Sequence, residues 1–454
     1  SSDVCSSIFF PPGWLIFLFQ YTIPCAEKQN PAFFIVFLSF THEKQHFMQF
    51  CLLDSPQKCY NCINRTSIFF QHPKEVFVCC LIVSLRCVFW VTPYIRGGGI
   101  DSPRPASQRA AAFILTAAML TTLAAPAFAK TWYIEDGDIT VKASDTGNDV
   151  TQKDKTTYGD KDTIITNRNE GTASSNTVTI DANGKNDKVE VTLKDVNIDT
   201  SSRNKAAVSV TGSGNTTIKL DGDNHLTGGN GIYSNSSGSL TITGGENDSL
   251  TAQGGDSRNG IYSVSGDVTI SGGKVTATGG NSTGSYGSGG DGIHSGSLTI
   301  SGGTVTATGG GSTGSNGLGG RGICSDSGGV TISGGSTVTA NGGNGSSGGD
   351  GISSSSGVTV SDGTVTANGG NGGNVSGDGI RSGGGVTISG NTVNAAGGNG
   401  GKVGGYGICS FDRVAISGGT VEAAGGNGST GGGSGIYSSV IDLSGSLELT
   451  AKAG

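Results

Sequence analysis

A column of chemically active side chains follows a recurring Gly-Ile pair in the second half of this 454-residue chain. The residues after the successive pairs are Tyr233, Tyr262, His294, Cys324, Ser353, Arg381, Cys409 and Tyr437. Tyrosine rings one strand spacing apart form a ladder on which sugar rings can lie by CH–π contact. The column therefore predicts a carbohydrate-binding surface, with tyrosines that merely shield a sheet as the alternative. The candidate binding residues are Tyr233, Tyr262, His294, Arg381 and Tyr437.

A second column precedes each of these glycines. Its members are Asn230, Asn259, Asp291, Arg321, Asp350, Asp378, Tyr406 and Ser434. Asn and Asp before Gly are favoured in turns for backbone reasons, so a turn is the expected role. Asp350 and Asp378 are one repeat apart and could together hold calcium, although Ca²⁺ takes six or more oxygen ligands and only two carboxylates are identifiable. Calcium is the one cofactor that the sequence suggests.

The sequence gives less support to a disulfide, to a functional histidine and to a catalytic site. Cys324 and Cys409 are three repeats apart, about 14 Å on a parallel sheet, which exceeds the reach of a disulfide. His225 and His294 have no partner in the sequence, and we expect both to be solvated. Polysaccharide lyases and hydrolases cluster carboxylates with a basic residue. No close acidic pair recurs in one column here, so we expect no enzyme activity.

An outward Thr-x-Thr array would indicate an ice-binding solenoid. The third segment of each repeat carries such pairs at Thr276/Thr278 and Thr306/Thr308. The pattern then decays, which makes ice binding a minor alternative.

The elements that must position these columns are short and regularly spaced. The Gly-Ile pairs, from Gly231-Ile232 to Gly435-Ile436, are 29, 32, 30, 29, 28, 28 and 28 residues apart. Each repeat contains Gly-Ile-x-Ser, a form of Val-Thr-Ile-Ser-Gly-Gly and a form of Val-Thr-Ala-x-Gly-Gly, and each segment alternates apolar and polar residues as a strand does. A fixed period of this length is typical of a solenoid. A propeller blade would need about 40 residues and four longer strands, and the calcium-roll repeat has a period of nine.

The pattern predicts an all-β fold, a right-handed parallel β-helix with about 28–30 residues and three short strands per coil. Inward residues would stack on the next coil about 4.8 Å away, and corner glycines would supply positive φ. Degenerate coils are expected at Val189–Leu193 with Val196–Ile198, and at Ala207–Val210 with Thr217–Leu220 and Asn224–Leu226. We assign residues 181–454 to the β-helix and the more charged residues 130–180 to a polar N-terminal cap.

Composition excludes several classes of protein. Glycine accounts for 70 of the 227 residues from Gly228 to Gly454, but no proline follows Pro126, which excludes collagen. The net charge of −7 and the absence of Lys/Arg clusters argue against nucleic-acid binding. A flexible Gly/Ser tract is disfavoured because the Ile and Val residues recur in register.

The first 129 residues read differently from the rest. Residues 1–99 hold eight of the ten cysteines and fourteen of the seventeen phenylalanines, and no apolar run there makes a convincing membrane span. Residues 100–129 combine a basic start, an apolar stretch and Ala127-Phe-Ala129 before Lys130, as a secretory signal peptide does. We therefore interpret 1–99 as non-native, upstream-translated or disordered sequence, and expect cleavage after Ala129.

The run from Asp187 to Asp199, Ala206-Ala-Val-Ser-Val, Thr217-Ile-Lys-Leu, Gly-Ile-Tyr-Ser and Leu-Thr-Ile-Thr-Gly-Gly resembles a family of secreted bacterial right-handed β-helix proteins described as carbohydrate-binding. The resemblance covers about residues 175–454. It implies an extracellular, non-catalytic polysaccharide-binding protein, sometimes with calcium. The long Gly/Asn corners of this chain depart from the family.

The sequence therefore predicts a secreted or cell-surface, non-catalytic polysaccharide-binding β-helix protein. The main alternative is a structural or adhesin surface repeat protein without specific glycan binding, and a polysaccharide lyase or an ice-binding protein is less favoured. We expect a monomer whose partner is a polysaccharide or glycan, with no nucleic acid and no membrane span in the mature chain. The final Leu449-Thr-Ala-Lys-Ala-Gly454 lacks a capping element, so we expect the C-terminus to be truncated.

Overall fold

The computed structural model describes residues 14–20, 33–40, 46–53 and 130–454. The chain divides into two units, Ser1–Met119 and Leu120–Gly454. In the first unit, β1 (Trp14–Gln20), β2 (Phe33–Phe40) and β3 (His46–Leu53) form an antiparallel sheet. These apolar runs, which we did not assign to the fold from the sequence, have the length of a strand. The expected signal peptide at 100–129, with Ala127 and Ala129, lies outside the described residues.

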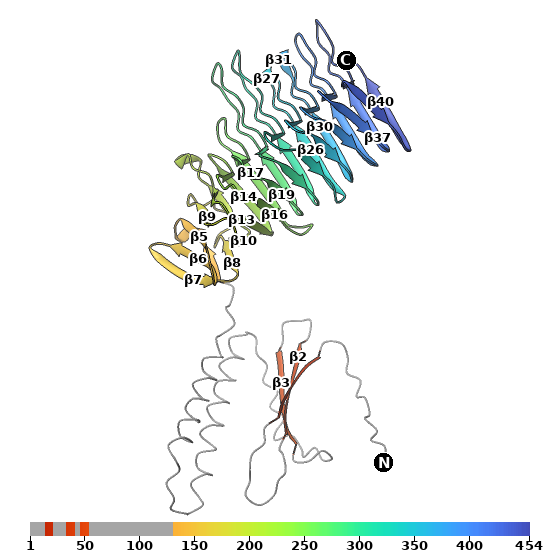
Figure 1. Cartoon of the computed structure of the whole chain (residues 1–454). Helices are drawn as coiled ribbons and strands as arrows, with labels where there is room; N and C mark the ends of the chain where they lie inside the picture. The colour runs from red at the N-terminus through yellow and green to blue at the C-terminus, as the bar shows by residue number, and fades with distance from the viewer. Residues whose placement is uncertain (1–13, 21–32, 41–45, 54–129) are drawn as a thin grey trace, which may run out of the picture. The chain divides into compact units, whose positions relative to one another are not determined.

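The second unit confirms the expected parallel β-helix, a solenoid of about ten turns with three sheets along its length (Figure 1). We name the sheets by the motif that each contains. All strand pairs in them are parallel except β5–β6 and β6–β7, which are antiparallel. No helix in the described part of the chain is long and apolar enough to cross a membrane.

The Gly-Ile sheet has thirteen strands. They are β5 (Ile139–Ser144), β6 (Gly147–Gln152), β7 (Lys155–Asp160), β9 (Val178–Ala182), β12 (Val208–Gly212), β15 (Ile232–Ser234), β18 (Ile261–Ser263), β21 (Ile293–Ser295), β24 (Ile323–Ser325), β28 (Ile352–Ser354), β32 (Ile380–Ser382), β35 (Ile408–Ser410) and β38 (Ile436–Tyr437).

The Val-Thr-Ile sheet has twelve strands. They are β4 (Lys130–Tyr133), β8 (Thr163–Thr166), β10 (Lys188–Lys194), β13 (Asn215–Asp221), β16 (Leu240–Thr243), β19 (Val268–Ile270), β22 (Leu298–Ile300), β25 (Val330–Ile332), β29 (Val358–Val360), β33 (Val386–Ile388), β36 (Arg413–Ile416) and β39 (Val440–Leu443).

The Val-Thr-Ala sheet has ten strands. They are β11 (Asn197–Asp199), β14 (Asp223–Gly228), β17 (Ser249–Gly254), β20 (Lys274–Thr278), β23 (Thr304–Thr308), β26 (Ser336–Asn341), β30 (Gly363–Asn368), β34 (Asn391–Ala396), β37 (Gly419–Ala424) and β40 (Leu447–Lys452). The remaining elements are the short pair β27 (Gly345–Ser347) and β31 (Gly372–Val375) and two 3-10 turns, η1 (Ile134–Asp136) and η2 (Ser201–Arg203).

The core is a stack of identical side chains. The first inward residue of the Gly-Ile sheet is isoleucine in seven successive coils, and all seven are fully buried: Ile232, Ile261, Ile293, Ile323, Ile352, Ile380 and Ile408. The inward Val and Ala of the Val-Thr-Ala sheet, such as Val275 and Ala277, are also fully buried. Burial of one such isoleucine contributes roughly 2 kcal/mol, which a strand of three residues could not gain alone. The columns therefore explain why such short strands form.

The solenoid begins earlier than we expected. β4 and β10 both pair in parallel with β8, and β5 pairs in parallel with β9. Residues 130–180, which we expected to form a separate polar cap, therefore already contribute strands to two of the three sheets. The antiparallel β5–β6–β7 segment is the only part of this stretch that departs from the solenoid pattern, and its last strand is largely exposed. The two degenerate coils upstream of Gly231 are confirmed as β10 with β11 and as β12, β13 and β14.

Glycine has two different roles at the corners. Between the Val-Thr-Ile and Val-Thr-Ala sheets, Gly273 and Gly303 have φ of +79° and +81°, so positive φ is confirmed at that corner. Between the Val-Thr-Ala and Gly-Ile sheets, Gly343 and Gly370 have no positive φ. A Cβ at Gly370 would instead clash with the backbone carbonyl of Gly343 in the preceding coil. The expectation was therefore incomplete, because close stacking of backbones is the reason for glycine at this second corner.

The Ser of the Gly-Ile-x-Ser segment is buried in the seven coils from Ser234 to Ser410, and in several of them it closes a corner. Ser325 Oγ donates to the carbonyl oxygens of Gly296 (2.8 Å) and Gly328 (3.0 Å), and Ser382 Oγ donates to that of Gly385 (3.2 Å). These bonds add a side-chain donor to corner carbonyls, some of which also accept a backbone N–H, as the Gly385 carbonyl does from Val358 at 3.0 Å. Ser295 differs from its equivalents, because its buried Oγ has no hydrogen-bond partner among the described residues.

Candidate functional site

The outward column of the Gly-Ile sheet is formed in the register that the sequence predicted. Tyr233 pairs with Tyr262, Tyr262 with His294 and His294 with Cys324. The pairing continues through Ser353, Arg381, Cys409 and Tyr437. The five candidate binding residues consequently share one column, but their surroundings separate them into three groups and the isolated Tyr437.

The first group is a pair of tyrosines over a groove, which we call the tyrosine groove. The ring centroids of Tyr233 and Tyr262 are 5.7 Å apart with an interplanar angle of 52°. The groove has a volume of about 480 Å³. It is lined by Thr177, Thr179, Asn204, Lys205, Ala206, Ser209, Gly229, Asn230, Tyr233, Arg258 and Tyr262. Burial raises the pKa of the Tyr262 hydroxyl, which therefore remains a neutral donor and acceptor near pH 7.

Sequence reasoning missed the polar wall of the tyrosine groove. Asn204 follows η2, Lys205 lies beside it, and Arg258 lies in the loop after β17. No ion pair involving Lys205 or Arg258 is formed within the described ranges. These residues belong to loops of unequal length, so the repeat period did not place them beside the tyrosines. Two basic side chains and two amides surround a pair of aromatic rings that are tilted by 52° to each other.

The second group, which we call the histidine cluster, surrounds His294. Its Nδ1 lies 2.7 Å from Asp291 Oδ2, and its Nε2 lies 2.8 Å from Asp326 Oδ2. Cys324 Sγ donates to Asp326 Oδ1 at 3.3 Å and accepts from Arg321 Nη1 at 2.9 Å. The expectation that His294 is solvated was wrong, because its side chain is only 17% exposed and is held between two carboxylates.

Electrostatics in the histidine cluster follow from burial and from the two carboxylates. Burial acts to lower the pKa of His294, but the hydrogen bond and charge of Asp291, together with Asp326, outweigh it and raise the pKa. Burial raises the pKa of the Cys324 thiol to about 12, against the opposing charge of Arg321. Cys324 is therefore an inert thiol when no metal is bound.

The third group, which we call the arginine cluster, surrounds Arg381. Its Nε lies 3.3 Å from Asp350 Oδ2, and its Nη2 lies 2.9 Å from Asp378 Oδ2. The side chain of Asp378 is only 2% exposed. Burial, and then the charge of Asp350, raise the pKa of Asp378 to about 6, although Arg381 opposes them. The two calcium candidates are thus already bridged by a guanidinium, which a calcium ion would have to displace.

The side chains of the pre-glycine column, for which we expected a turn role, link successive coils by hydrogen bonds. Asn230 Oδ1 accepts from the backbone N–H of Asn259 (2.9 Å), and Asn259 Oδ1 accepts from that of Asp291 (2.7 Å). The same bond joins Asp350 to Asp378 (2.8 Å). Each of these side chains therefore uses one oxygen to link its coil to the next, and the second carboxylate oxygen of an aspartate remains for other partners.

Tyr437 lies apart from the other candidates. Its ring stacks on Tyr406 with centroids 4.9 Å apart and an interplanar angle of 19°. Tyr406 is a member of the pre-glycine column, so contact across the two columns was not expected. The stacked pair forms a second aromatic surface, and Tyr437 is 50% exposed.

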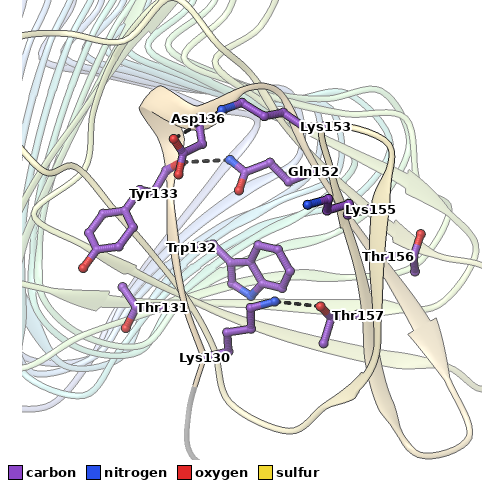
Figure 2. A pocket seen from close by; sticks show the side chains of 10 residues that line it. All are labelled: Lys130, Thr131, Trp132, Tyr133, Asp136, Gln152, Lys153, Lys155, Thr156 and Thr157. Carbon is purple, nitrogen blue, oxygen red and sulfur yellow. Dashed lines mark hydrogen bonds and ion pairs between the residues drawn. The ribbon is translucent and has the colours of Figure 1, made fainter.

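A cavity of about 620 Å³ lies where the solenoid begins (Figure 2). Lys130 Nζ lies 3.7 Å from the ring centroid of Trp132 and donates to Thr157 Oγ1 at 2.7 Å. Trp132 itself is only 6% exposed, and its Nε1 donates to Asp160 Oδ2. The indole is therefore part of the packing between β4 and β7, and its face is covered by a lysine.

The threonine array of the Val-Thr-Ala sheet runs further in one column than in the other. Thr276, Thr306, Thr339 and Thr366 lie in register, whereas the second column changes from Thr308 to Asn341. The decay that argued against ice binding is confirmed in that second column.

Cys324 and Cys409 are both free and buried, in agreement with the expectation that they do not pair.

No protein-family model matches this chain, and no curated protein or solved structure shows a significant match to it. The fold and the geometry of the outward column are therefore the basis for any functional assignment.

Proposed function

We propose that this chain is a secreted or cell-surface β-helix protein that binds polysaccharide without chemical turnover, through the tyrosine groove. The observation that carries the proposal is the Tyr233–Tyr262 pair, which lies beside a hollow lined with polar side chains. Aromatic faces bind the apolar face of a sugar ring, and surrounding amides and charges bind its hydroxyl groups. The resemblance of residues 175–454 to secreted carbohydrate-binding β-helix proteins supports the same proposal.

The polar wall of the groove favours an acidic polysaccharide. Lys205 and Arg258 are the charged residues that line the groove. A guanidinium can bind the carboxylate of a uronic acid through two parallel hydrogen bonds. Neutral glycans would use the tyrosines and amides alone and bind more weakly.

Binding to insoluble and soluble polysaccharides tests the proposal. Pull-down and affinity electrophoresis of the full chain would compare polygalacturonate, alginate, cellulose and chitin. We expect Tyr262→Ala to weaken binding to the acidic glycans by roughly 5–30-fold, equivalent to about 1–2 kcal/mol. Tyr286→Ala is the matched control, because Tyr286 is 80% exposed on a loop away from the groove.

Three outcomes would change the assignment. Equal retention of the Tyr262→Ala and Tyr286→Ala variants would exclude the tyrosine groove as the binding surface. No binding by the parent chain to any glycan would favour the structural or adhesin repeat protein. Release of unsaturated, ultraviolet-absorbing sugars from the acidic glycans would identify a lyase instead.

Export has its own test. The Ala127-Phe-Ala129 pattern before Lys130 is the basis for proposing a secreted or surface location. Mass spectrometry of the exported protein should find a mature N-terminus at Lys130. An intact N-terminal segment on exported protein, or retention inside the cell, would contradict the proposal.

A further inference from the structure

The histidine cluster has the side-chain chemistry of a metal site. The ligand atoms of Asp291, His294 and Cys324 all lie within 4.8 Å of one another. Asp326 contacts both His294 Nε2 and Cys324 Sγ through its two carboxylate oxygens. We propose that His294, Cys324 and Asp326 bind a zinc ion, with Asp291 orienting the imidazole from behind.

The distances suit a four-coordinate ion. Zinc holds nitrogen and oxygen ligands at about 2.0–2.2 Å and sulfur at about 2.3 Å, which places tetrahedral ligand atoms about 3.3–3.8 Å apart. The present separations are 2.8 Å from His294 Nε2 to Asp326 Oδ2 and 3.3 Å from Cys324 Sγ to Asp326 Oδ1. The Nε2–Oδ2 distance is below this range, so the Asp326 side chain must rotate away from His294 to admit the ion. Asp326 is 62% exposed, so it can move and a water molecule can take the fourth position.

The residues around the three ligands complete the site. Asp291 Oδ2 accepts from His294 Nδ1 and directs Nε2 towards Asp326, as in other carboxylate–histidine–zinc arrangements. Arg321 Nη1 points at Cys324 Sγ from 2.9 Å and can donate to the thiolate. Asp291 and Arg321 are also joined to each other, because Asp291 Oδ1 accepts from the backbone N–H of Arg321 at 2.6 Å. This bond between adjacent coils holds both residues in place.

Charge balance favours a divalent ion. Both ring nitrogens of His294 lie within hydrogen-bond distance of a carboxylate, so both carry a proton, and the imidazolium, Arg321 and the two carboxylates give a net charge of zero. When zinc binds, His294 Nε2 and the Cys324 thiol each release a proton to solvent, and the ring and the thiolate coordinate the ion. Three negative groups then face the two charges of zinc and the one of Arg321, so the net charge is zero. A mixed nitrogen, oxygen and sulfur ligand set is borderline in softness, as zinc prefers.

The scaffold holds the two deepest ligands in place before the metal arrives. His294 and Cys324 lie opposite each other on β21 and β24, in the register of the buried Ile293 and Ile323 that precede them. The site therefore needs little ordering when it binds an ion, which reduces the entropy cost of binding.

Cobalt substitution tests the site on the full chain. Co²⁺ bound to a thiolate gives a sulfur-to-metal charge-transfer band in the near ultraviolet, which counts the cysteine ligands. We expect Cys324→Ser to lose the band of one thiolate relative to the parent chain. Cys409→Ser is the matched control, since Cys409 is also buried in the same column but next to Arg381. The eight N-terminal cysteines contribute equally to every variant, so the difference spectra report only the exchanged residue.

A second measurement avoids any folding defect of the cysteine variant. Asp326→Asn changes an exposed side chain and should leave the circular dichroism of the chain unchanged. We expect it to weaken zinc binding about 10–100-fold in calorimetry and to reduce the rise in melting temperature that zinc gives the parent chain. Identical cobalt spectra for Cys324→Ser and Cys409→Ser, or unchanged zinc affinity in Asp326→Asn, would overturn the proposal.

Discussion

The histidine cluster and the arginine cluster occupy equivalent positions on the Gly-Ile sheet, three coils apart. Each places a basic side chain after Gly-Ile, an aspartate three residues before it and a buried cysteine in the next coil. In the arginine cluster a permanent guanidinium lies between two carboxylates, so the charges are balanced within the protein. In the histidine cluster the place of the permanent guanidinium is taken by a titratable ring, whose pKa the two carboxylates raise.

The residue two positions after the cysteine sharpens this difference. It is Asp326 in the histidine cluster and Phe411 in the arginine cluster. Asp326 contacts both His294 and Cys324, whereas the Phe411 ring centroid lies 6.0 Å from the Arg381 guanidinium. The same strand positions thus hold a permanent ion pair in the arginine cluster and a set of candidate metal ligands in the histidine cluster. The comparison teaches that single exchanges on a fixed backbone decide which kind of site is formed.

The largest effect should come from separating the coils that carry the arginine cluster. Gly370 lies between the coils of Asp350 and Asp378, and a Cβ there would clash with the carbonyl of Gly343. We expect Gly370→Ala to lower the free energy of unfolding by about 3–5 kcal/mol in urea denaturation. Gly431→Ala, where nothing lies within 4 Å of the added Cβ, should change it by less than about 0.5 kcal/mol. Similar effects at both positions would refute the close-stacking account.

The next largest effect on stability should come from removal of the Arg381 guanidinium, the cation between the two carboxylates of the arginine cluster. Arg381→Ala leaves Asp350 and the buried Asp378 without a counter-charge, which we expect to cost roughly 2–4 kcal/mol at pH 7. Arg413→Ala is the control, because its ion pair with Asp442 is more than half exposed and should contribute less than about 1 kcal/mol. Chemical denaturation of both variants measures the difference, and equal losses would mean that the arginine cluster is only a surface ion pair.

Asp378 of the arginine cluster should make the stability of the fold depend on pH, with an effect of intermediate size. Burial and Asp350 raise the pKa of Asp378 to about 6 from 3.8, so the folded chain binds more protons than the unfolded chain between these values. The contribution of Asp378 to stability is therefore present below about pH 4 and is lost as pH rises through about 6. The loss is on the order of 1–3 kcal/mol.

Asp378→Asn isolates this pH effect. Urea denaturation between pH 4 and pH 7 should show a smaller fall in stability for this variant than for the parent chain. Asp362→Asn changes an exposed aspartate and should keep the parental fall. A parental pH profile in Asp378→Asn would show that the carboxyl is fully compensated by Arg381.

The smallest effect on stability should come from the buried serine that follows the central residue of each cluster. Ser382 follows Arg381 and donates to the carbonyl of Gly385, whereas Ser295 follows His294 and has no partner in the described part of the chain. We expect Ser382→Ala to cost about 1 kcal/mol, and Ser295→Ala to be neutral or slightly stabilising. Thermal unfolding of the pair measures the difference. A cost at Ser295 equal to that at Ser382 would indicate an unseen partner for its hydroxyl.

The sequence predicted the columns because they depend only on period. Alternation of apolar and polar residues placed Tyr233, Tyr262, His294 and Arg381 on one outward face, and the strand register agrees. Their true neighbours could not be foreseen in the same way. Arg258 comes from a corner whose length varies from coil to coil, so counting residues does not place it.

Two further features were hidden for physical reasons. Asp326 contacts His294 from the following coil, and that contact depends on how the chain leaves β24 rather than on the repeat. The close stacking at Gly370 is a contact between backbones, for which a glycine-rich sequence gives no distinct sign beyond composition. The signal that could have found the histidine cluster was the coincidence of Asp291, His294, Cys324 and Asp326 within two adjacent repeats.

The stacking of glycine corners has a consequence for how such a chain can change over evolutionary time. In the last coils the Gly-Ile pairs recur every 28 residues, and each corner accepts only a neighbour of matching shape. A gain or loss of part of a coil would therefore disrupt several columns at once, whereas a whole coil could be added or removed with every column intact. Recombination between neighbouring repeats would move the two clusters apart or together in steps of about 4.8 Å, the spacing of parallel strands.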